Sequence, residues 1–378
     1  MAVSSSPEPC IVFFSGGTAL GASAAVLMRK THHTVHIVTP FDSGGSSAAL
    51  RRAFTMPAVG DIRARLLALA ECTEPDVERL VRLLGLRLPA NETEEYLQAE
   101  LGRMIKAEHP LVACLPEISR AYVCAQLRVV AEAMPASMSL LGACVGNLVL
   151  AGGYLASNRR FEPVLDALSE LLHVQGIVLP VSSVCGHLCA QLEDGSIVMG
   201  QHRLTGKAYK PVSSPISRVW LTKDLDNPAP IHIPADPHVC EVVTRADLIC
   251  YPMGSFYSSI VANLLPEGIN AAVAAADCTK VFVPNLGKDP ELLGQTLRDQ
   301  IAFLSASMQS DASRPLDRVL NTLLIDIAHE RYSGGVPVDW LAGEGINLVS
   351  APLVSTASDP YIDPELLSEA LMPLCRVR

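Results

Sequence analysis

The residues best suited to chemistry lie in one stretch, Val38 to Arg52, which leads from an apolar segment into paired arginines. Within it the acid Asp42 precedes two glycines and two serines, Gly44, Gly45, Ser46 and Ser47. Glycines let backbone N–H groups turn toward a ligand without a Cβ in the way. Serines at a helix start leave its N–H groups and the positive end of its dipole directed at an anion. The stretch predicts a phosphate-binding loop; a simple turn and surface helix is the alternative.

Positive charge is concentrated just after this loop. Between residues 43 and 70 the chain has a single acid, Asp61, although its formal net charge is −10. The same segment contains four arginines, Arg51, Arg52, Arg63 and Arg65. Guanidinium groups bind phosphate oxygens in a two-pronged geometry. We expect Arg51 and Arg63 to neutralise a diphosphate, with a solvated helix charge as the alternative for Arg51.

Two more glycine loops with hydroxyl residues follow short apolar runs, at 11–14 and 248–251. In a parallel sheet such loops share the carboxyl edge, where ligands of these sheets bind. We therefore predict three anion-binding loops at that edge. Thr18 is also a candidate cap for a helix over 19–30, and Tyr257 could equally belong to the core. The predicted contacts from these two loops are Gly16, Gly17, Thr18, Gly254, Ser255 and Tyr257.

Three polar residues have structural alternatives to a ligand role. Asn147 opens a charge-free helix that extends to Leu155, so its amide must find a partner in the protein or on the ligand. Asp61 follows Gly60 and is either a helix N-cap or a ligand contact. Asp42 is either the catalytic carboxylate or a turn residue that caps the following helix.

Composition restricts the class of protein. With 378 residues, 49% of them hydrophobic and 18% charged, the chain can bury a sizeable core and is not a disordered protein. A pI near 5.5 argues against non-specific binding to nucleic acid or anionic membranes. The charge-free window 139–156 predicts a buried helix rather than a membrane span. Without an export signal, the eleven cysteines indicate free thiols in the cytoplasm.

Hydrophobic patterning indicates an α/β protein with a Rossmann-like, mostly parallel sheet. Residues 61–134 read as helical, so 71–135 is predicted to be a helical insertion between the core segments 1–70 and 136–378. An Asp-Gly turn predicts a small antiparallel ribbon near 187–202, and a helix is expected over 291–308. Strands are predicted at 11–14, 34–39, 176–180, 218–221, 248–251, 280–283, 322–325 and 346–350.

These blocks resemble the family of the phospholactate transferase CofD and the gluconeogenesis factors typified by YvcK. The similarity runs along most of the chain, and the blocks at 44–47 and 60–63 are closer to the YvcK branch. The matching blocks are Gly-Gly-Thr at 16–18, Asp-Ser-Gly-Gly-Ser-Ser at 42–47, Gly-Asp-Ile-Arg at 60–63, Gly-Asn-Leu at 146–148, Gly-Ser-Phe-Tyr at 254–257 and Asn-Leu-Leu at 263–265. The resemblance implies a Rossmann-like fold and a ligand linked to a nucleotide diphosphate.

The resemblance leaves two functions open. A CofD-type transferase passes a phospholactyl group from a guanosine diphosphate conjugate to a deazaflavin alcohol with Mg²⁺, and Asp42 would be the base or magnesium partner. A YvcK-like protein binds a UDP-sugar without catalysis and regulates central carbon or cell-wall metabolism. Ser43 stands where the family has a second aspartate, which favours binding. We also expect a homodimer, and a protein partner for the helical insertion.

Overall fold

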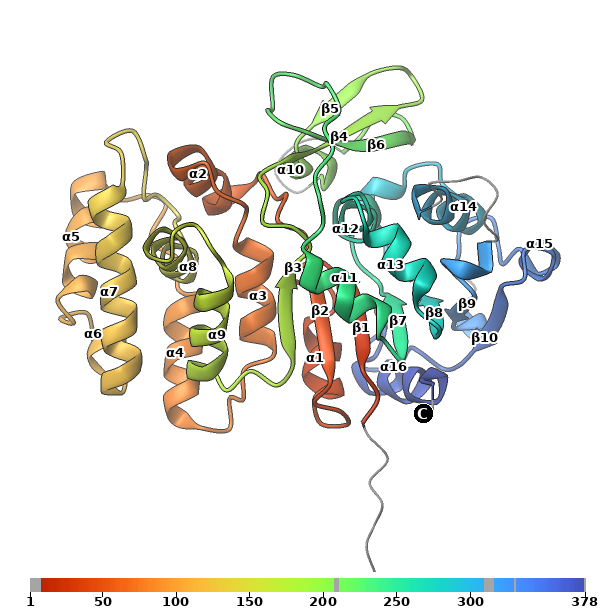
Figure 1. Cartoon of the computed structure of the whole chain (residues 1–378), viewed down its shortest axis with the longest axis horizontal. Helices are drawn as coiled ribbons and strands as arrows, with labels where there is room; N and C mark the ends of the chain where they lie inside the picture. Colours follow the sequence, from red (N-terminus) through yellow and green to blue (C-terminus); the bar gives the residue numbers. More distant parts are fainter. Residues whose placement is uncertain (1–7, 207–210, 309–315, 330, 377–378) are drawn as a thin grey trace, which may run out of the picture. The chain divides into compact units, whose positions relative to one another are not determined.

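The computed structural model describes residues 8–206, 211–308, 316–329 and 331–376 (Figure 1). Residue contacts divide the chain into two compact units. Unit 1 consists of residues 1–39, 176–182 and 186–378, and unit 2 consists of residues 40–175 and 183–185. The helical insertion predicted at 71–135 lies within unit 2.

Unit 1 is built on a seven-stranded parallel sheet with the order β10-β9-β8-β7-β1-β2-β3. The inner strands of this sheet are buried on both faces, as parallel strands require; β1, for example, is Ile-Val-Phe-Phe-Ser and fully buried. Each of these strands matches a strand predicted from the sequence. They are β1 (Ile11–Ser15), β2 (Thr34–Val38), β3 (Ile177–Pro180), β7 (Leu248–Tyr251), β8 (Thr279–Phe282), β9 (Thr322–Ile325) and β10 (Asn347–Ser350).

Helices cover both faces of this sheet. The chain moves outward from β1 to β2 through α1 (Gly21–Leu27), and in the opposite direction from β7 to β8 through α13 (Ile269–Ala275). Because such crossovers are right-handed, α1 and α13 lie on opposite faces. Helix α16 (Pro364–Leu371) packs against α1, and α11 (Pro237–Thr244) packs against α13 (Figure 1).

The predicted ribbon is a three-stranded antiparallel sheet with the order β5-β4-β6. Its strands are β4 (His187–Leu192), β5 (Ile197–Met199) and β6 (Ile216–Thr222). The second predicted strand is shorter than expected because Gly200, with φ +95°, ends it. Helix α10 (Gln201–Leu204) follows directly. The strand predicted at 218–221 supplies the third member of this sheet.

The helix predicted over 291–308 is wrong at its start. Pro290–Leu292 form a short 3-10 turn, Gly294 has φ +72°, and α14 runs only from Leu297 to Met308. Thr296 and Asp299 cap its first turn reciprocally, because each side chain accepts the other residue's backbone N–H. A threonine three residues before an acid is the sequence signal for this helix start.

Unit 2 is helical and centred on α8 (Val145–Ala156), which contacts α2, α3, α4, α7 and α9. This helix is charge-free and apolar on all sides, as a central helix must be. Gly152 allows its close approach to α7, since a Cβ there would lie 2.0 Å from the carbonyl oxygen of Gln126. The other helices are α2 (Gly45–Phe54), α3 (Gly60–Ala68), α4 (Pro75–Gly85), α5 (Glu94–Ile105), α6 (Pro110–Ala113), α7 (Glu117–Ala133) and α9 (Glu162–Leu171).

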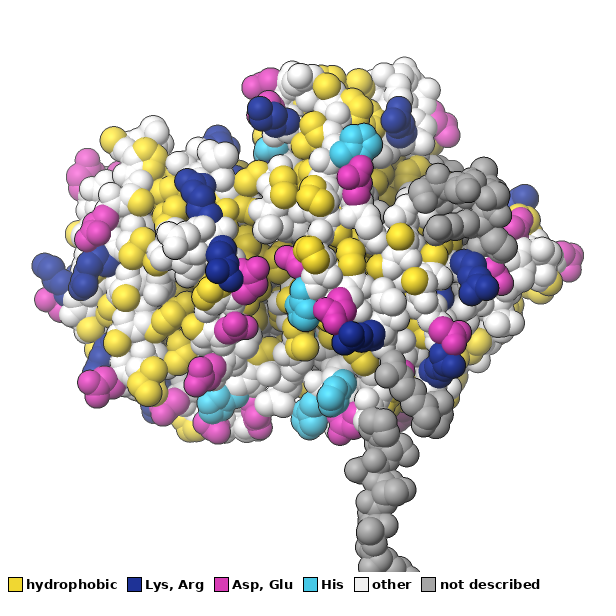
Figure 2. Space-filling view, viewed as in Figure 1, with side chains coloured by type: hydrophobic (Ala, Val, Ile, Leu, Met, Phe, Trp, Pro, Cys, Tyr) yellow, Lys and Arg dark blue, Asp and Glu magenta, His cyan; other side chains and the backbone are white. Residues whose placement is uncertain are grey.

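The surface carries charge of both signs. On the face shown in Figure 2, the described acidic and basic side chains are interspersed, and they form no extended basic stripe. Within the parts of the chain that the structure describes, no helix combines the length and apolar character needed to cross a membrane.

Candidate functional site

The loop before α2 has the geometry of an anion-binding turn. The carboxylate Oδ1 of Asp42 accepts the backbone N–H of Gly44 at 2.9 Å, so Asp42 shapes the turn without capping the helix itself. Gly44 is extended and Gly45, with φ +51°, begins α2. The start of α2 has no side-chain cap and no acid in its first turn. Its N–H groups and dipole therefore favour a negative charge.

Arg51 holds the backbone of this loop through hydrogen bonds. Its side chain is 7% exposed, and its guanidinium donates to the carbonyl oxygens of Phe41 at 3.2 Å and Asp42 at 2.8 Å. Burial lowers the pKa of Arg51, and the neighbouring Cys185 and Asp42 act in the opposite direction. Arg51 is therefore a buried charge that fixes the loop, and not a solvated helix charge.

Asn147 faces the same helix start. Its amide Nδ2 donates to Ser46 Oγ at 2.9 Å, and the residue is 2% exposed. Its Oδ1 has no hydrogen-bond partner among the described residues. A buried amide oxygen without a donor costs about 1–3 kcal/mol. The protein therefore pairs the Nδ2 group of this amide, and the Oδ1 can accept a hydrogen bond from a ligand.

The start of α3 lies against the loop. A Cβ on Gly60 would be 2.8 Å from Ser47 Oγ and 3.5 Å from Asp42 Oδ2, so glycine permits the close approach. Asp61 lies in the first turn of α3, where the helix dipole stabilises an acid. The N-cap position belongs to Val59, so the predicted N-cap role of Asp61 is wrong.

Arg63 runs along the start of α8. Its guanidinium donates to Cys144 Sγ, and a Cβ on Gly146 would lie 2.8 Å from its Cδ and 2.4 Å from the carbonyl oxygen of Leu84. Arg63 therefore lies beside the first turn of α8, which carries Asn147. The fold brings Asp42, the Gly44–Ser47 loop, Arg51, Arg63 and Asn147 together within unit 2.

Arg65 lies on the same helix α3 and is not one of the predicted ligand residues. It is fully buried, and burial lowers its pKa to about 10, while the charge of Asp61 raises it. Arg65 therefore keeps its charge at neutral pH. Its sequence signal is the i, i+4 spacing of Asp61 and Arg65 on one face of α3.

In unit 1, the predicted glycine loops follow the adjacent strands β1 and β7. A Cβ on Gly254 would lie 3.5 Å from the Cβ of Ala19, so the two loops are neighbours. Thr18 does not cap α1, because the helix begins at Gly21, whose N–H donates to the Thr18 carbonyl oxygen. The loops at Gly16–Thr18 and Gly254–Ser255 thus lie side by side at the carboxyl edge of unit 1.

The N–H groups that follow Gly254 are already engaged by carboxylates. Phe256 N–H donates to Asp289 Oδ2 at 2.8 Å, and the N–H groups of Tyr257 and Ser258 both donate to Glu291 Oε2 at 2.9 Å. Tyr257 is fully buried and its hydroxyl donates to a backbone carbonyl. Tyr257 lies in the core, the alternative that the sequence left open.

Asn263, which belongs to the matching block at 263–265, is a positioning residue. It is fully buried, and its Nδ2 donates to the carbonyl oxygens of Ser15 at 3.1 Å, Ile37 at 3.4 Å and Ser259 at 2.8 Å. These bonds tie the carboxyl ends of β1 and β2 to the helical segment after β7.

The residues of the loop do not form a protein-held magnesium site. Among the described residues, no three His, Cys, Asp or Glu side chains gather closely enough to hold a metal ion. Asp42 is the only carboxylate of the loop 42–47, and one of its oxygens accepts the Gly44 N–H. Magnesium at a phosphate site is usually held by one or two carboxylates together with phosphate oxygens and water, so Asp42 is the residue of this loop that would contact such an ion.

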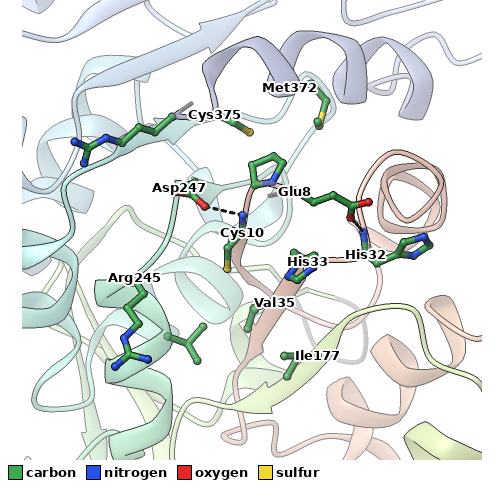
Figure 3. Close-up of a pocket in the computed structure, with 13 residues that line it drawn as sticks. Glu8, Cys10, His32, His33, Val35, Ile177, Arg245, Asp247, Met372 and Cys375 are labelled. Atoms are coloured by element: carbon green, nitrogen blue, oxygen red, sulfur yellow. Dashed lines mark hydrogen bonds between the residues drawn. The ribbon is translucent and has the colours of Figure 1, made fainter. Parts of the chain in front are cut away.

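A cavity of about 800 Å³ lies at the amino ends of β1, β2 and β7, the edge opposite to the glycine loops (Figure 3). Cys10, His33, Val35 and Asp247 are among its lining residues, and the Cys10 N–H donates to Asp247 Oδ2 at 2.9 Å. The predicted site residues are not part of this lining.

Comparison with known proteins supports the sequence resemblance. A family model described as 2-phospho-L-lactate transferase CofD matches residues 11–354. The gluconeogenesis factor of Bacillus subtilis is 30% identical over 302 residues, which cover 80% of this chain and 75% of that protein. The gluconeogenesis factor of Halalkalibacterium halodurans is 28% identical over 292 residues, covering 77% and 71%. A crystal structure of a Bacillus halodurans protein has a TM-score of 0.68 at 25% identity, covering 97% of this chain and 99% of that one.

Proposed function

Because the chain belongs to the CofD family, we propose that it is a non-catalytic regulatory protein that binds a ligand linked to a nucleotide diphosphate. The ligand class we favour is a UDP-sugar. The gluconeogenesis-factor names of its relatives support a role in regulating central carbon metabolism.

The observation that carries the proposal is the unpaired Oδ1 of Asn147 beside the uncapped start of α2. The helix start suits the diphosphate, because its N–H groups and dipole favour an anion. Arg51 places a fixed positive charge beneath the loop, and Arg63 adds a second beside α8. The Asn147 oxygen can accept a hydroxyl or N–H group of the ligand, which gives selectivity beyond charge.

The same geometry favours binding over transfer. Activating an acceptor alcohol requires a carboxylate base near the reacting hydroxyl. Asp42 already uses one oxygen to hold the Gly44 N–H, and Ser43 removes the second carboxylate of the family pattern. The other polar groups of the site, Arg51, Arg63 and the start of α2, can bind an anion. Binding of this kind is sufficient for a regulatory protein. We propose that the helical insertion presents the surface for its partner protein, and that the chain forms a homodimer.

The proposal is tested by calorimetric titration of the full chain with UDP-N-acetylglucosamine, UDP and GDP, with and without Mg²⁺. We expect a magnesium-independent interaction with the UDP-sugar that Asp42→Asn retains and Asn147→Leu weakens at least tenfold, a loss of about 1.4 kcal/mol. Asn91→Leu, at an exposed position of unit 2, is the matched control and leaves the affinity unchanged.

Two results would contradict the proposal. Release of GMP from a guanosine-linked lactyl donor, in the presence of deazaflavin alcohol and Mg²⁺, would identify a transferase, with Asp42→Asn as its inactive control. Absence of any saturable binding of the three nucleotides would remove nucleotide recognition altogether.

A further inference from the structure

A second cavity, of about 460 Å³, lies in unit 1 at the carboxyl ends of β8 and β9. It is enclosed by the loop that follows β8, by α14 and by the segment after β9. The polar side chains that line it are Asn285, Lys288, Asp289, Gln295, Gln300, Arg331, Tyr332 and Ser333. Its volume suits a small molecule, because ligand pockets run from about 300 to 1,000 Å³.

Gln300 is the buried polar group of this cavity. It lies on α14 and is 7% exposed, and its side-chain amide forms no hydrogen bond with a described residue. The residue as a whole is buried, and its amide is not among the polar atoms that are sealed from solvent without a partner. The amide borders the cavity, where a ligand hydroxyl could both donate to it and accept from it.

The cavity wall carries two cations and one carboxylate, Lys288, Arg331 and Asp289. Lys288 is exposed at its wall and forms no ion pair within the described chain. Arg331 is held by Asp359 at 2.7 Å, and Asp289 is occupied by the backbone N–H groups of Phe256 and Glu291. The ammonium of Lys288 therefore remains available for a phosphate, for which lysine is a common point-charge partner.

We propose that this cavity is a second ligand site, which binds a small phosphorylated polyol. Lys288 contacts the phosphate, and the Gln300 amide pairs with a hydroxyl of the polyol. The Gln295 amide also borders the cavity, and its Nε2 donates to the Ile216 carbonyl oxygen at 3.4 Å. Asn285 has both amide atoms bonded to the backbone of Gly254, so it forms a rigid wall. The residues of this site belong to unit 1.

The test is calorimetric titration of the full chain with ribose 5-phosphate and glycerol 3-phosphate, compared with ribose and with inorganic phosphate. We expect saturable binding of the polyol phosphates, and at least tenfold weaker binding of ribose and of inorganic phosphate. Lys288→Gln and Gln300→Leu should each weaken the polyol phosphates about tenfold, equivalent to about 1.4 kcal/mol. Lys223→Gln, an exposed lysine outside the cavity, should leave the affinity unchanged.

Failure of both polyol phosphates to bind at millimolar concentration would overturn the proposal. Inorganic phosphate binding as tightly as ribose 5-phosphate would exclude the polyol, and unchanged affinity in Lys288→Gln would exclude this location. Because Lys288 is exposed, its substitution should leave the fold intact even if Gln300→Leu does not. UDP-sugar binding measured on the same variants should be unaltered, which separates this site from the proposed nucleotide function.

Discussion

Asn147 provides the sharpest test of the proposed site, because ligand binding and stability should respond to its replacement in opposite directions. We consider Asn147→Leu, which keeps the side chain close to its original size and removes both polar atoms. In the structure the amide donates once, to Ser46 Oγ at 2.9 Å. Its Oδ1 is buried without a partner among the described residues.

In the absence of ligand, Asn147→Leu should be more stable than the wild type. Removing the unpaired oxygen recovers about 1–3 kcal/mol, and losing the bond to Ser46 costs about 0.5–1.5 kcal/mol. Ser46 is half-buried, so its hydroxyl can pair with water after the change. The net expectation is a gain of about 1 kcal/mol in the free energy of unfolding. For a domain of 150–250 residues, that corresponds to a rise in Tm of about 2–4 °C.

Ligand binding should favour the wild type over Asn147→Leu. If the Oδ1 accepts a ligand group, its loss weakens UDP-sugar binding by about 1–3 kcal/mol, roughly ten- to a hundredfold in Kd. The assay is calorimetric unfolding without ligand and titration with UDP-N-acetylglucosamine, on wild type, Asn147→Leu and the control Asn91→Leu. A variant that is less stable by about 2 kcal/mol but binds the UDP-sugar with unchanged affinity would refute the reasoning, because Asn147 would then be purely structural.

The remaining substitutions test the packing and charge of both units by urea unfolding. Gly146→Ala should lower the free energy of unfolding by about 1–3 kcal/mol, because its Cβ would lie 2.4 Å from the Leu84 carbonyl oxygen. Gly102→Ala, in open space on α5, should raise it by about 1 kcal/mol. Equal effects of the two substitutions would contradict this reasoning. Arg51→Met should lower the free energy of unfolding by about 2–4 kcal/mol, because two charged hydrogen bonds are lost. Arg52→Met, at an exposed position, should change it by less than about 0.5 kcal/mol. Burial raises the pKa of Glu291 to about 7, above its value of about 4.3 in an unfolded chain. The folded state therefore favours the protonated form, so the free energy of unfolding should fall as pH rises from about 4.3 to 7, by at most about 4 kcal/mol. Glu291→Gln should flatten this pH dependence, and an unchanged slope would refute the reasoning.

The strands were predictable because their signals are local. Each is a short apolar run bounded by glycine, proline or a polar turn, and the glycine loops after β1 and β7 indicate a parallel sheet with its ligand edge at those loops. The order of β8, β9 and β10 follows from successive crossovers of one hand. Most of the fold of unit 1 therefore follows from patterns within about ten residues.

The engagement of the loop at Gly254 was not predictable in this way. Its glycine and hydroxyl residues have the local pattern of a phosphate loop, and that pattern was interpreted so. In the structure, Asp289 and Glu291, more than thirty residues further along, accept the N–H groups of Phe256, Tyr257 and Ser258. A carboxylate of the chain satisfies such donors as well as a phosphate does, and no local signal distinguishes the two. The burial of Arg51 and Arg65 also depends on segments distant in the sequence, so the local pattern does not predict it.

The buried arginines indicate which part of a nucleotide should dominate binding. Arg51 and Arg65 are held away from water and keep their protons at neutral pH, since even the lowered pKa of Arg65 is about 10. Asp42 and Asp61 balance these two charges, and Arg63 leaves an excess of one positive charge near the start of α2. A diphosphate presents two phosphoryl groups, so it can face the helix start and Arg63 together, whereas a monophosphate has only one such group. UDP should therefore retain most of the affinity of the UDP-sugar, whereas UMP and uridine should lose at least tenfold, about 1.4 kcal/mol. Equal affinities for uridine and UDP would show that the base, and not the charge of unit 2, governs recognition.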